Sequence, residues 1–247
     1  MINRRLAIGL CCLLAACADA TSDDADNATT NTLTNTLTNT LTTTGAAADR
    51  DAAALGSTVR VRADGCGPRT RLGIGTIVEE SLIVTAAHVV AGSGRVDVVD
   101  RDGVVTTATV ILFDPDQDLA LLRADVPAGA VAVVRSDEPT AGEAGIVAVT
   151  DDGGDELELV DATVTRTVTV RTTDIYGDGV VLRDGFEIDA SIEPGDSGAM
   201  VHFPGGVSGL VWARSLEATD RAWAVTVPRD LLETPRSAPP VDTGPCP

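Results

Sequence analysis

From Ser57 to its end, the chain alternates short apolar runs with clusters of glycine, aspartate and proline. Most of the runs are rich in valine and threonine, and several alternate apolar with polar positions, which is typical of β-strands. We predict strands at Thr58–Arg62, Leu72–Val78, Leu82–Thr85, Arg95–Val99, Val104–Leu112, Leu119–Ala124, Val131–Arg135, Ala144–Thr150, Leu157–Arg171, Val180–Leu182, Phe186–Ile188, Ala199–Phe203, Val207–Ala213 and Ala222–Val227. Their number and spacing, with no long amphipathic helix between them, predict an all-β sandwich or barrel architecture.

A turn-forming cluster, Pro127-Ala128-Gly129, lies near the middle of this region. Proline and glycine interrupt strands, so this cluster divides the predicted strands into two sets of about six. Close to the end of the chain, Pro228-Arg229-Asp230-Leu231-Leu232 predicts a short C-terminal helix.

Residues 1–16 have the features of an export signal. Arg4 and Arg5 precede a short apolar core that ends in small residues and is too short to span a membrane. Leu14-Ala15-Ala16-Cys17 resembles a bacterial lipobox, which implies cleavage after residue 16 and acylation of Cys17. Ala18 follows, with no aspartate to indicate retention at the inner membrane, so we expect a lipoprotein of the bacterial cell envelope, anchored to the outer membrane. The alternative is an ordinary secretory signal in which Cys17 plays no part.

Residues 17–56 differ in composition from the rest of the chain. The segment is polar and contains three copies of Asn-Thr-Leu-Thr, the first at Asn31–Thr34. Such a composition buries too little apolar surface to offset the entropy lost on ordering. We therefore predict a disordered Thr/Asn-rich tether at 17–56, a folded domain at 57–236 and a Pro-rich tail at 237–247.

Cysteine usage agrees with export. Two cysteines belong to the predicted signal and a third is Cys17, which leaves Cys66 and Cys246 near opposite ends of the folded domain. In an oxidising compartment this pair is a candidate disulfide that would pin the tail to the first strands. The alternative is two unpaired thiols.

Composition excludes several functional classes. The formal net charge of −19 argues against binding nucleic acid through its phosphates. All 18 basic residues are arginines, so a serine–lysine dyad and Schiff-base chemistry are excluded. With only two histidines, His88 and His202, we expect no multi-histidine metal site and no cofactor.

The motif that indicates chemistry is Glu193-Pro194-Gly195-Asp196-Ser197-Gly198. A serine between glycines, after a proline and between two strand-like runs, is expected on a tight exposed turn. Such a turn can direct the amides of Gly195 and Ser197 at one point, as in an oxyanion hole. A serine hydroxyl is a weak nucleophile unless a base takes its proton, so this motif requires a histidine and a carboxylate that holds the histidine.

Both partners occur in the first half of the domain. Leu82-Ile83-Val84-Thr85-Ala86-Ala87-His88 is a β-branched strand that runs into small residues and then a histidine. Asp118 opens the apolar run Leu119-Ala120-Leu121-Leu122, so its side chain is expected to be drawn partly inward, where it can orient an imidazole. Asp114 and Asp116 fit solvated, turn-forming roles instead. His202 is expected to be a strand residue without a catalytic part.

Together these three motifs resemble the trypsin-like serine proteases, over about residues 57–234. Thr85-Ala86-Ala87-His88, Asp118-Leu119-Ala120-Leu121-Leu122 and Gly195-Asp196-Ser197-Gly198 look like the family's histidine, aspartate and serine motifs. The longer string from Asp189 to Gly198 looks closer to the HtrA-like bacterial branch, without the PDZ domain of that branch. The resemblance implies two six-stranded antiparallel β-barrels, at about 57–126 and 130–230, with the active site in the cleft between them.

The same resemblance implies an exported serine endopeptidase that acts on proteins or peptides through an acyl-enzyme. The other reading is a catalytically silent member of the fold that serves as a cell-surface binding module. An esterase of the α/β-hydrolase type is disfavoured because Ala199 replaces the glycine of its serine motif and the order of the three residues differs.

Three positions bear on specificity and activation. Ser191, six residues before Ser197, occupies the place that in the family lies at the base of the primary pocket, and an uncharged residue there disfavours cleavage after arginine or lysine. Trp212 belongs to a predicted pocket wall, where it either narrows the pocket or only packs. Asp196 is the acid that in chymotrypsin-type relatives pairs with a newly cleaved amino terminus. Because no activation site precedes the first strand, the partner of Asp196 stays open.

Overall fold

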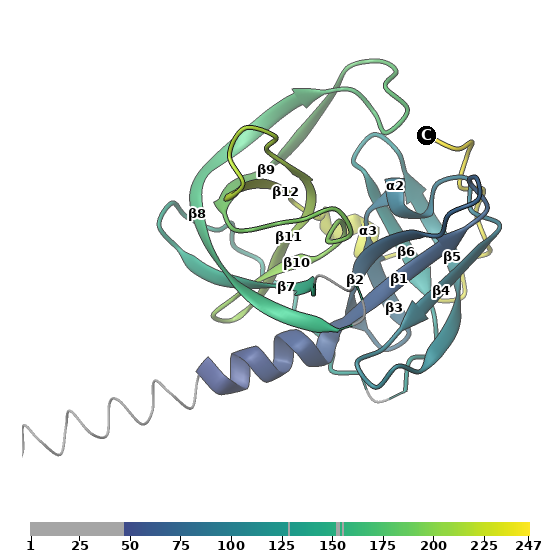
Figure 1. The fold of residues 1–247 in the computed structure, drawn as a ribbon, viewed down its shortest axis with the longest axis horizontal. Coiled ribbons are helices and arrows are strands. Elements are labelled where there is room, and N and C mark those ends of the chain that lie inside the picture. Colours follow the sequence, from purple (N-terminus) through teal and green to yellow (C-terminus); the bar gives the residue numbers. More distant parts are fainter. Residues whose placement is uncertain (1–46, 128, 152–153, 155) are drawn as a thin grey trace, which may run out of the picture. The chain divides into compact units, whose positions relative to one another are not determined.

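The computed structural model describes residues 47–247 except residues 128, 152–153 and 155 (Figure 1). The predicted signal peptide, the lipidation position Cys17 and the tether as far as residue 46 lie outside the described residues. Among those that are described, no helix is long and apolar enough to cross a membrane.

Two closed antiparallel barrels of six strands each make up the fold (Figure 1). The first barrel has the strand order β1-β2-β3-β6-β5-β4 and the second has the order β10-β11-β12-β9-β8-β7. The strands of the first are β1 (Thr58–Asp64), β2 (Arg71–Glu79), β3 (Leu82–Thr85), β4 (Arg95–Val99), β5 (Val105–Asp114) and β6 (Leu119–Arg123). Those of the second are β7 (Ala144–Thr150), β8 (Leu157–Thr172), β9 (Val181–Asp189), β10 (Met200–Phe203), β11 (Gly206–Arg214) and β12 (Arg221–Val225). Outside the barrels lie two short helices, α2 (Ala87–Val90) and α3 (Arg229–Leu232), and a helical segment at residues 47–57 precedes β1. The predicted fold class is confirmed.

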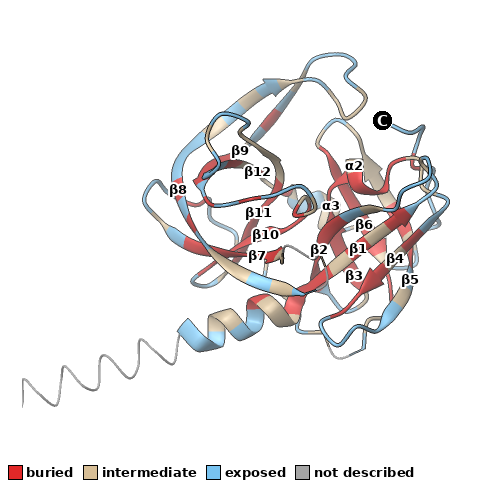
Figure 2. Ribbon diagram, in the orientation of Figure 1, coloured by how far each residue is buried: buried red, intermediate tan, exposed pale blue. Residues whose placement is uncertain are grey.

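Each barrel encloses its own apolar core, visible as the buried faces of the strands in Figure 2. Ile83 and Leu122 are fully buried and sit opposite each other across β3 and β6. Phe186 and Ile188 fill the core of the second barrel, and along β9 they alternate with the partly buried Gly185 and with Glu187, a charged residue that is itself buried. Burying one such side chain contributes about 1.5–3 kcal/mol, so the alternation of apolar and polar positions fixes which face of each strand turns inward.

Three predicted strands differ from the structure. The segment Val131–Arg135 forms only an isolated bridge, between Val134 and Val207, and both Val131 and Val133 are exposed. Its partly buried Ala132 and Val134 pack against the apolar core, but the segment is not paired with a neighbouring strand along its length, so it belongs to neither barrel. The runs at Val180–Leu182 and Phe186–Ile188 are parts of the single strand β9. Gly185 lies inside it because a Cβ there would approach the Ala224 carbonyl oxygen to 2.0 Å.

The predicted disordered tether extends too far toward the folded domain. Residues 47–57 are helical, and the hydroxyls of Ser57 and Thr58 donate to the carbonyls of Ala53 and Ala54 at the end of this helix. Ala54 is fully buried. The local cause is composition, since alanine has the highest helix propensity and the last ten residues of the predicted tether contain five alanines.

The C-terminal tail is fastened to the first barrel. Cys66 and Cys246 form a disulfide that closes a loop of sequence separation 180. Beside it, the Gly92 amide donates to the Thr243 carbonyl at 3.0 Å. A side chain at Gly92 would meet both the Cys66 sulfur and the Cys246 backbone nitrogen at less than 3 Å, so the tail packs directly after α2.

His202 on β10 gives the fold a predicted dependence on pH. Its side chain is buried, its Nε2 has no hydrogen-bond partner among the described residues, and burial lowers its pKa from 6.5 to about 4, with the charge of Arg50 adding to the effect. The folded state therefore holds the imidazole neutral, whereas the unfolded chain binds a proton below about pH 6.5. The stability that His202 contributes is present above that pH and is lost as the pH falls toward 4, by about 2–3 kcal/mol.

We expect His202→Leu to lose less stability between pH 7 and pH 4 than the wild type. Urea unfolding at both pH values measures this, and the difference between the two proteins removes the contribution of the carboxylates. Equal losses in the two proteins would show that His202 is not the group responsible.

Candidate active site

His88 enters the site on the short helix α2, directly after strand β3. Ala86 and Ala87 before it are fully buried, so this part of the chain packs closely against the core as it enters α2. The His88 side chain itself is one-third exposed. Arg71 of β2 donates from its guanidinium to the carbonyls of His88 and Ala91, which ties α2 to the first barrel.

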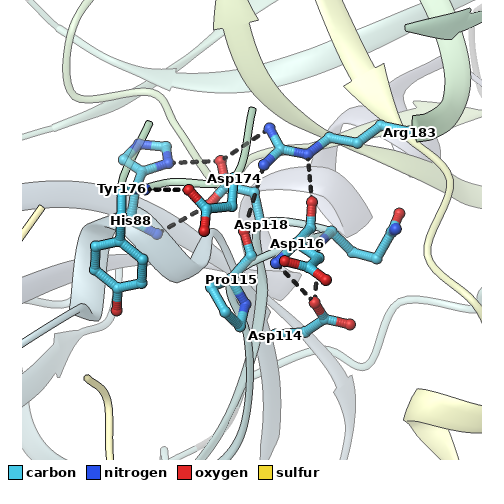
Figure 3. A network of polar contacts seen from close by, with 9 residues as sticks. His88, Asp114, Pro115, Asp116, Asp118, Asp174, Tyr176 and Arg183 are labelled. Carbon is cyan, nitrogen blue, oxygen red and sulfur yellow. Dashed lines mark hydrogen bonds and ion pairs between the residues drawn. The ribbon is translucent and has the colours of Figure 1, made fainter. Parts of the chain in front are cut away.

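Asp118 lies at the end of the β5–β6 loop and faces His88 (Figure 3). Its carboxylate is buried and accepts two bonds from the histidine: Oδ1 from the His88 amide at 2.9 Å and Oδ2 from the His88 Nδ1 at 2.8 Å. The Asp118 carbonyl also accepts from the Ala87 amide at 3.2 Å. A proton held at Nδ1 leaves the Nε2 lone pair free, which is the tautomer that a general base needs.

The loop that carries Asp118 is ordered by its own side chains. Asp114 Oδ1 accepts from the amides of Asp116 and Gln117, at 3.0 and 2.9 Å. This is the turn-forming role that the sequence predicts for Asp114. Asp118 has a φ of +57°, a left-handed conformation that is uncommon for a residue with a side chain. The loop must therefore be held in place by contacts that offset this strain.

Ser197 belongs to the second barrel but is bonded to the first. The Ile74 amide of β2 donates to the Ser197 carbonyl at 2.9 Å, and the Gly198 amide donates to Val211 of β11 at 2.8 Å. Gly198 has a φ of +97°, and a Cβ there would lie 2.1 Å from the Ile74 carbonyl oxygen and 3.0 Å from the Ala86 nitrogen. Only glycine permits this approach, which brings the serine segment against the residues that lead into His88.

Asp196 supports the turn that precedes Ser197. The carboxylate is buried, its Oδ1 accepts from the amide and the hydroxyl of Thr150 at 2.9 and 3.0 Å, and its Oδ2 accepts from the Glu193 amide at 2.8 Å. The partner left open by the sequence is thus Thr150, at the end of β7, and no cleaved amino terminus is required to satisfy the charge. Charge-assisted bonds of this kind are among the strong ones, so the loop is well fixed.

Two amides of this turn are available to a ligand. The Asp196 amide is used internally, by the Glu193 carbonyl at 3.1 Å. Within the described part of the chain, the amides of Gly195 and Ser197 have no acceptor. Gly195 has a φ of +117°, which allows the turn that exposes them. Two unpaired donors on either side of a bonded one are suited to an incoming oxyanion.

The two predicted pocket residues have different surroundings. Ser191 is exposed, before the turn. Trp212 on β11 stacks on the guanidinium of Arg183, whose Cζ is 4.5 Å from the ring centroid. Nothing in these contacts tests a role in substrate binding, which stays a prediction for both. Arg183 and Thr150 had no signal in the sequence, because each reaches its partner across a different strand.

No group of three or more His, Cys, Asp and Glu in the described residues is arranged to hold a metal ion. The groups described above are a carboxylate, an imidazole, a hydroxyl and two amides without an acceptor among the described residues. Such a set can take a proton from the hydroxyl and stabilise an oxyanion.

Comparison with known proteins bears on the same region. The model of the trypsin-like peptidase domain matches residues 73–206. The serine protease Rv3671c of Mycobacterium tuberculosis (strain ATCC 25618 / H37Rv) is 31% identical over 203 residues, which are 79% of this chain and 50% of that protein. The chain thus spans about half the length of the curated relatives it matches.

Among solved structures, the active form of the Rv3671c protease from M. tuberculosis superimposes with a TM-score of 0.71 at 28% identity, over 80% of this chain and 88% of that one. The HtrA-type protease AlgW with a tripeptide gives a TM-score of 0.64 at 24% identity, over 75% of this chain and 61% of that one. The second likeness is one of fold.

Proposed function

The chain belongs to the trypsin-like peptidase family, and we propose that it is a serine endopeptidase in which His88, Asp118 and Ser197 are the catalytic residues. The observation that carries the proposal is the pair of bonds between Asp118 and His88, at 2.8 and 2.9 Å, beside a serine turn whose flanking amides are unpaired. Asp118 is buried and has a positive φ, and both features cost folding free energy. A protein that did not use Asp118 would gain stability by losing them.

In the proposed reaction, Ser197 Oγ attacks the carbonyl carbon of a peptide bond while His88 Nε2 takes the hydroxyl proton. Asp118 keeps the imidazole in the required tautomer and stabilises the imidazolium that forms. The amides of Gly195 and Ser197 donate to the oxyanion of the tetrahedral intermediate. His88 then gives its proton to the leaving amine, and the C–N bond breaks. In the second half of the reaction, His88 takes a proton from water, the water attacks the acyl carbon, and His88 returns the proton to Ser197 Oγ as the ester bond breaks.

Fluorophosphonate labelling tests the proposal without knowledge of the substrate. Such a probe phosphonylates an activated serine, so we expect the folded wild-type protein to become labelled at Ser197. A protein that is folded but does not react, under conditions in which related proteases do, would favour the alternative of a silent fold that binds partners at the cell surface.

Substrate preference follows from one residue. Ser191 lies where the family has the base of its primary pocket, and a hydroxyl offers no charge to pair with arginine or lysine. We therefore propose peptides with an uncharged residue before the cleaved bond as the preferred substrates. Profiling a peptide library for the residue before the cut measures this, and a majority of cuts after arginine or lysine would contradict it.

Thr150 supports the proposed oxyanion site through Asp196. Thr150→Val removes the hydroxyl that donates to Asp196 Oδ1 at 3.0 Å but keeps the amide bond at 2.9 Å. We expect the labelling rate to fall about 10-fold, because losing a bond to a buried charged group costs about 1.5–3 kcal/mol and loosens the turn. Thr169→Val is the matched control, since Thr169 donates to Asp184 in the same barrel on its exposed surface. An equal fall in both variants would assign the effect to the barrel rather than to the turn.

The export and anchoring that the sequence predicts belong to the same proposal. We propose that Cys17 is acylated, that the protein is held in the cell envelope by this lipid, and that the Cys66–Cys246 disulfide persists because that compartment is oxidising. The expected result is partition of the wild type into a detergent phase and of Cys17→Ala into the aqueous phase. Cys12→Ala, within the predicted signal, is expected to behave as the wild type. Wild-type protein in the aqueous phase would exclude the anchor.

A further inference from the structure

Arg183 is a buried cation that joins the two barrels at the proposed active site (Figure 3). It extends from β9 of the second barrel to the Asp114–Asp118 loop of the first, with its side chain only 3% exposed. Its Nε donates to the Asp116 carbonyl at 2.8 Å and its Nη2 to the Pro115 carbonyl at 3.5 Å. Its Nη1 lies 3.9 Å from Asp118 Oδ2, the oxygen that accepts from His88 Nδ1.

The environment of Arg183 shows that its charge is held there at a cost. Burial lowers the pKa of Arg183, and the negative charges of Asp118, Asp114, Asp116 and Asp174 oppose that effect. Arginine nevertheless stays protonated in proteins, so the guanidinium is a permanent positive charge. The indole of Trp212 covers one face of it at 4.5 Å and completes its enclosure.

The positive charge of Arg183 compensates the buried negative charge of Asp118. A neutral His88 leaves Asp118 as a buried carboxylate, 2% exposed, with no counter-charge from the histidine. Burying an unpaired charge is expensive, and Arg183 Nη1 is the cation that the structure places beside it. Arg71 of β2, the other arginine near His88, directs its guanidinium at backbone carbonyls of α2 instead.

Arg183 also holds the backbone on which Asp118 sits. The loop contains the positive φ of Asp118, which by itself favours a different conformation. Two carbonyls of this loop accept from Arg183, and a third contact comes from the same β8–β9 hairpin, where the Ile175 amide donates to the Pro115 carbonyl at 3.3 Å. The second barrel thus hydrogen-bonds to two successive carbonyls of this loop, those of Pro115 and Asp116.

We propose that Arg183 is a positioning residue of the active site: from the second barrel it fixes the loop that carries Asp118 and supplies the counter-charge of the Asp118 carboxylate. The inference rests on the proposed function. It assigns to Arg183 no contact with substrate; its effect on the reaction passes through Asp118 and the orientation of His88.

The test compares Arg183→Met, Arg183→Gln and Arg183→Lys with the matched control Arg135→Met. Arg135 is also a largely buried arginine, on the segment before β7, and its partners are Phe203, on which it stacks at 5.0 Å, and the carboxylates of Glu143 and Asp137. We expect the neutral Arg183 variants to react with a fluorophosphonate about 10–100-fold more slowly than the wild type. Arg183→Lys keeps the charge but not the forked donors, so it should recover part of the loss.

A spectroscopic readout separates positioning from general stability. In protein carrying Ser197→Ala, the His88 Nδ1 proton bonded to Asp118 should give a strongly downfield NMR resonance, a sign of a charge-assisted hydrogen bond. We expect this resonance to shift or broaden in the neutral Arg183 variants and to remain unchanged in Arg135→Met. A variant that was only less stable would keep the resonance in its folded fraction.

The results that would reject the role of Arg183 differ from those that would reject the proposed function. If the wild type does not label, the proposed function fails, whatever Arg183 does. If the wild type labels while folded neutral variants label equally fast and keep the resonance in place, the role of Arg183 is overturned alone. Neutral variants that do not fold at all would also overturn it, because Arg183 would then be required by the fold rather than by the site.

Discussion

Ser197→Ala should abolish turnover while leaving the fold in place. Removing the nucleophile of a serine protease costs about 10⁴–10⁶-fold in kcat, because no other group on the enzyme can form the acyl intermediate. The backbone of Ser197 does the structural work, through its carbonyl bond from Ile74, and alanine keeps that carbonyl. Thermal unfolding should therefore change little, and hydrolysis of a peptide found by library profiling should fall to the background rate.

Ser208→Ala is a suitable control for this measurement, since Ser208 is a buried serine on β11 of the same barrel. Its hydrolysis rate is expected to stay within about 2-fold of the wild type, as for most substitutions outside a site. Turnover that persisted in Ser197→Ala at more than about a hundredth of the wild-type rate would assign the nucleophile elsewhere.

Asp118→Asn is the second substitution with a large expected effect. The two oxygens of Asp118 both accept from His88, and an amide can present only one oxygen. Its NH₂ group would face either the His88 amide or Nδ1. In the second case the imidazole must carry its proton on Nε2, where it cannot act as a base toward Ser197. A loss of about 10⁴-fold in kcat is expected, as for other triads with the wrong tautomer.

Asp100→Asn provides the comparison for this variant. Asp100 is likewise a buried aspartate of the first barrel, but it accepts from the amides of Asp102 and Val104 in a turn. Its substitution should cost stability and leave the rate per folded molecule nearly unchanged. The kinetic assay with folded protein measured by circular dichroism distinguishes the two, and a comparable loss of rate in both would argue against a special role for Asp118.

The parts of this site that could be predicted are the residues that have a characteristic pattern of neighbours in the sequence. His88 follows a β-branched strand and two small residues, Asp118 opens an apolar run, and Ser197 stands among glycines that mark a tight turn. The barrels followed from strand spacing together with the family resemblance. Local patterns failed where a segment packs against the core without joining a sheet, as at Val131–Arg135, or where an alanine-rich helix was merged into a polar tether.

Other parts depend on strand register, which no local pattern contains. Arg183 meets Asp118 only because β9 runs past the β5–β6 loop, and Thr150 meets Asp196 only because β7 ends beneath the serine turn. The family resemblance implies a partner for Asp196, since the acid at this position pairs with a cleaved amino terminus in chymotrypsin-type relatives. The sequence alone cannot show which hydrogen-bond donor lies next to Asp196 once both barrels have folded.

The disulfide between Cys66 and Cys246 has a consequence if the proposed peptidase activity acts on other copies of this chain. These residues are 180 positions apart, so they enclose almost all of both barrels in one covalent ring. A single cut in any loop between them opens the ring but releases no fragment. Both new ends stay attached to the same molecule, close to the contacts that held them, and the catalytic residues of the two barrels remain in one piece. Self-digestion would then need two cuts, or a reductant, before the site came apart.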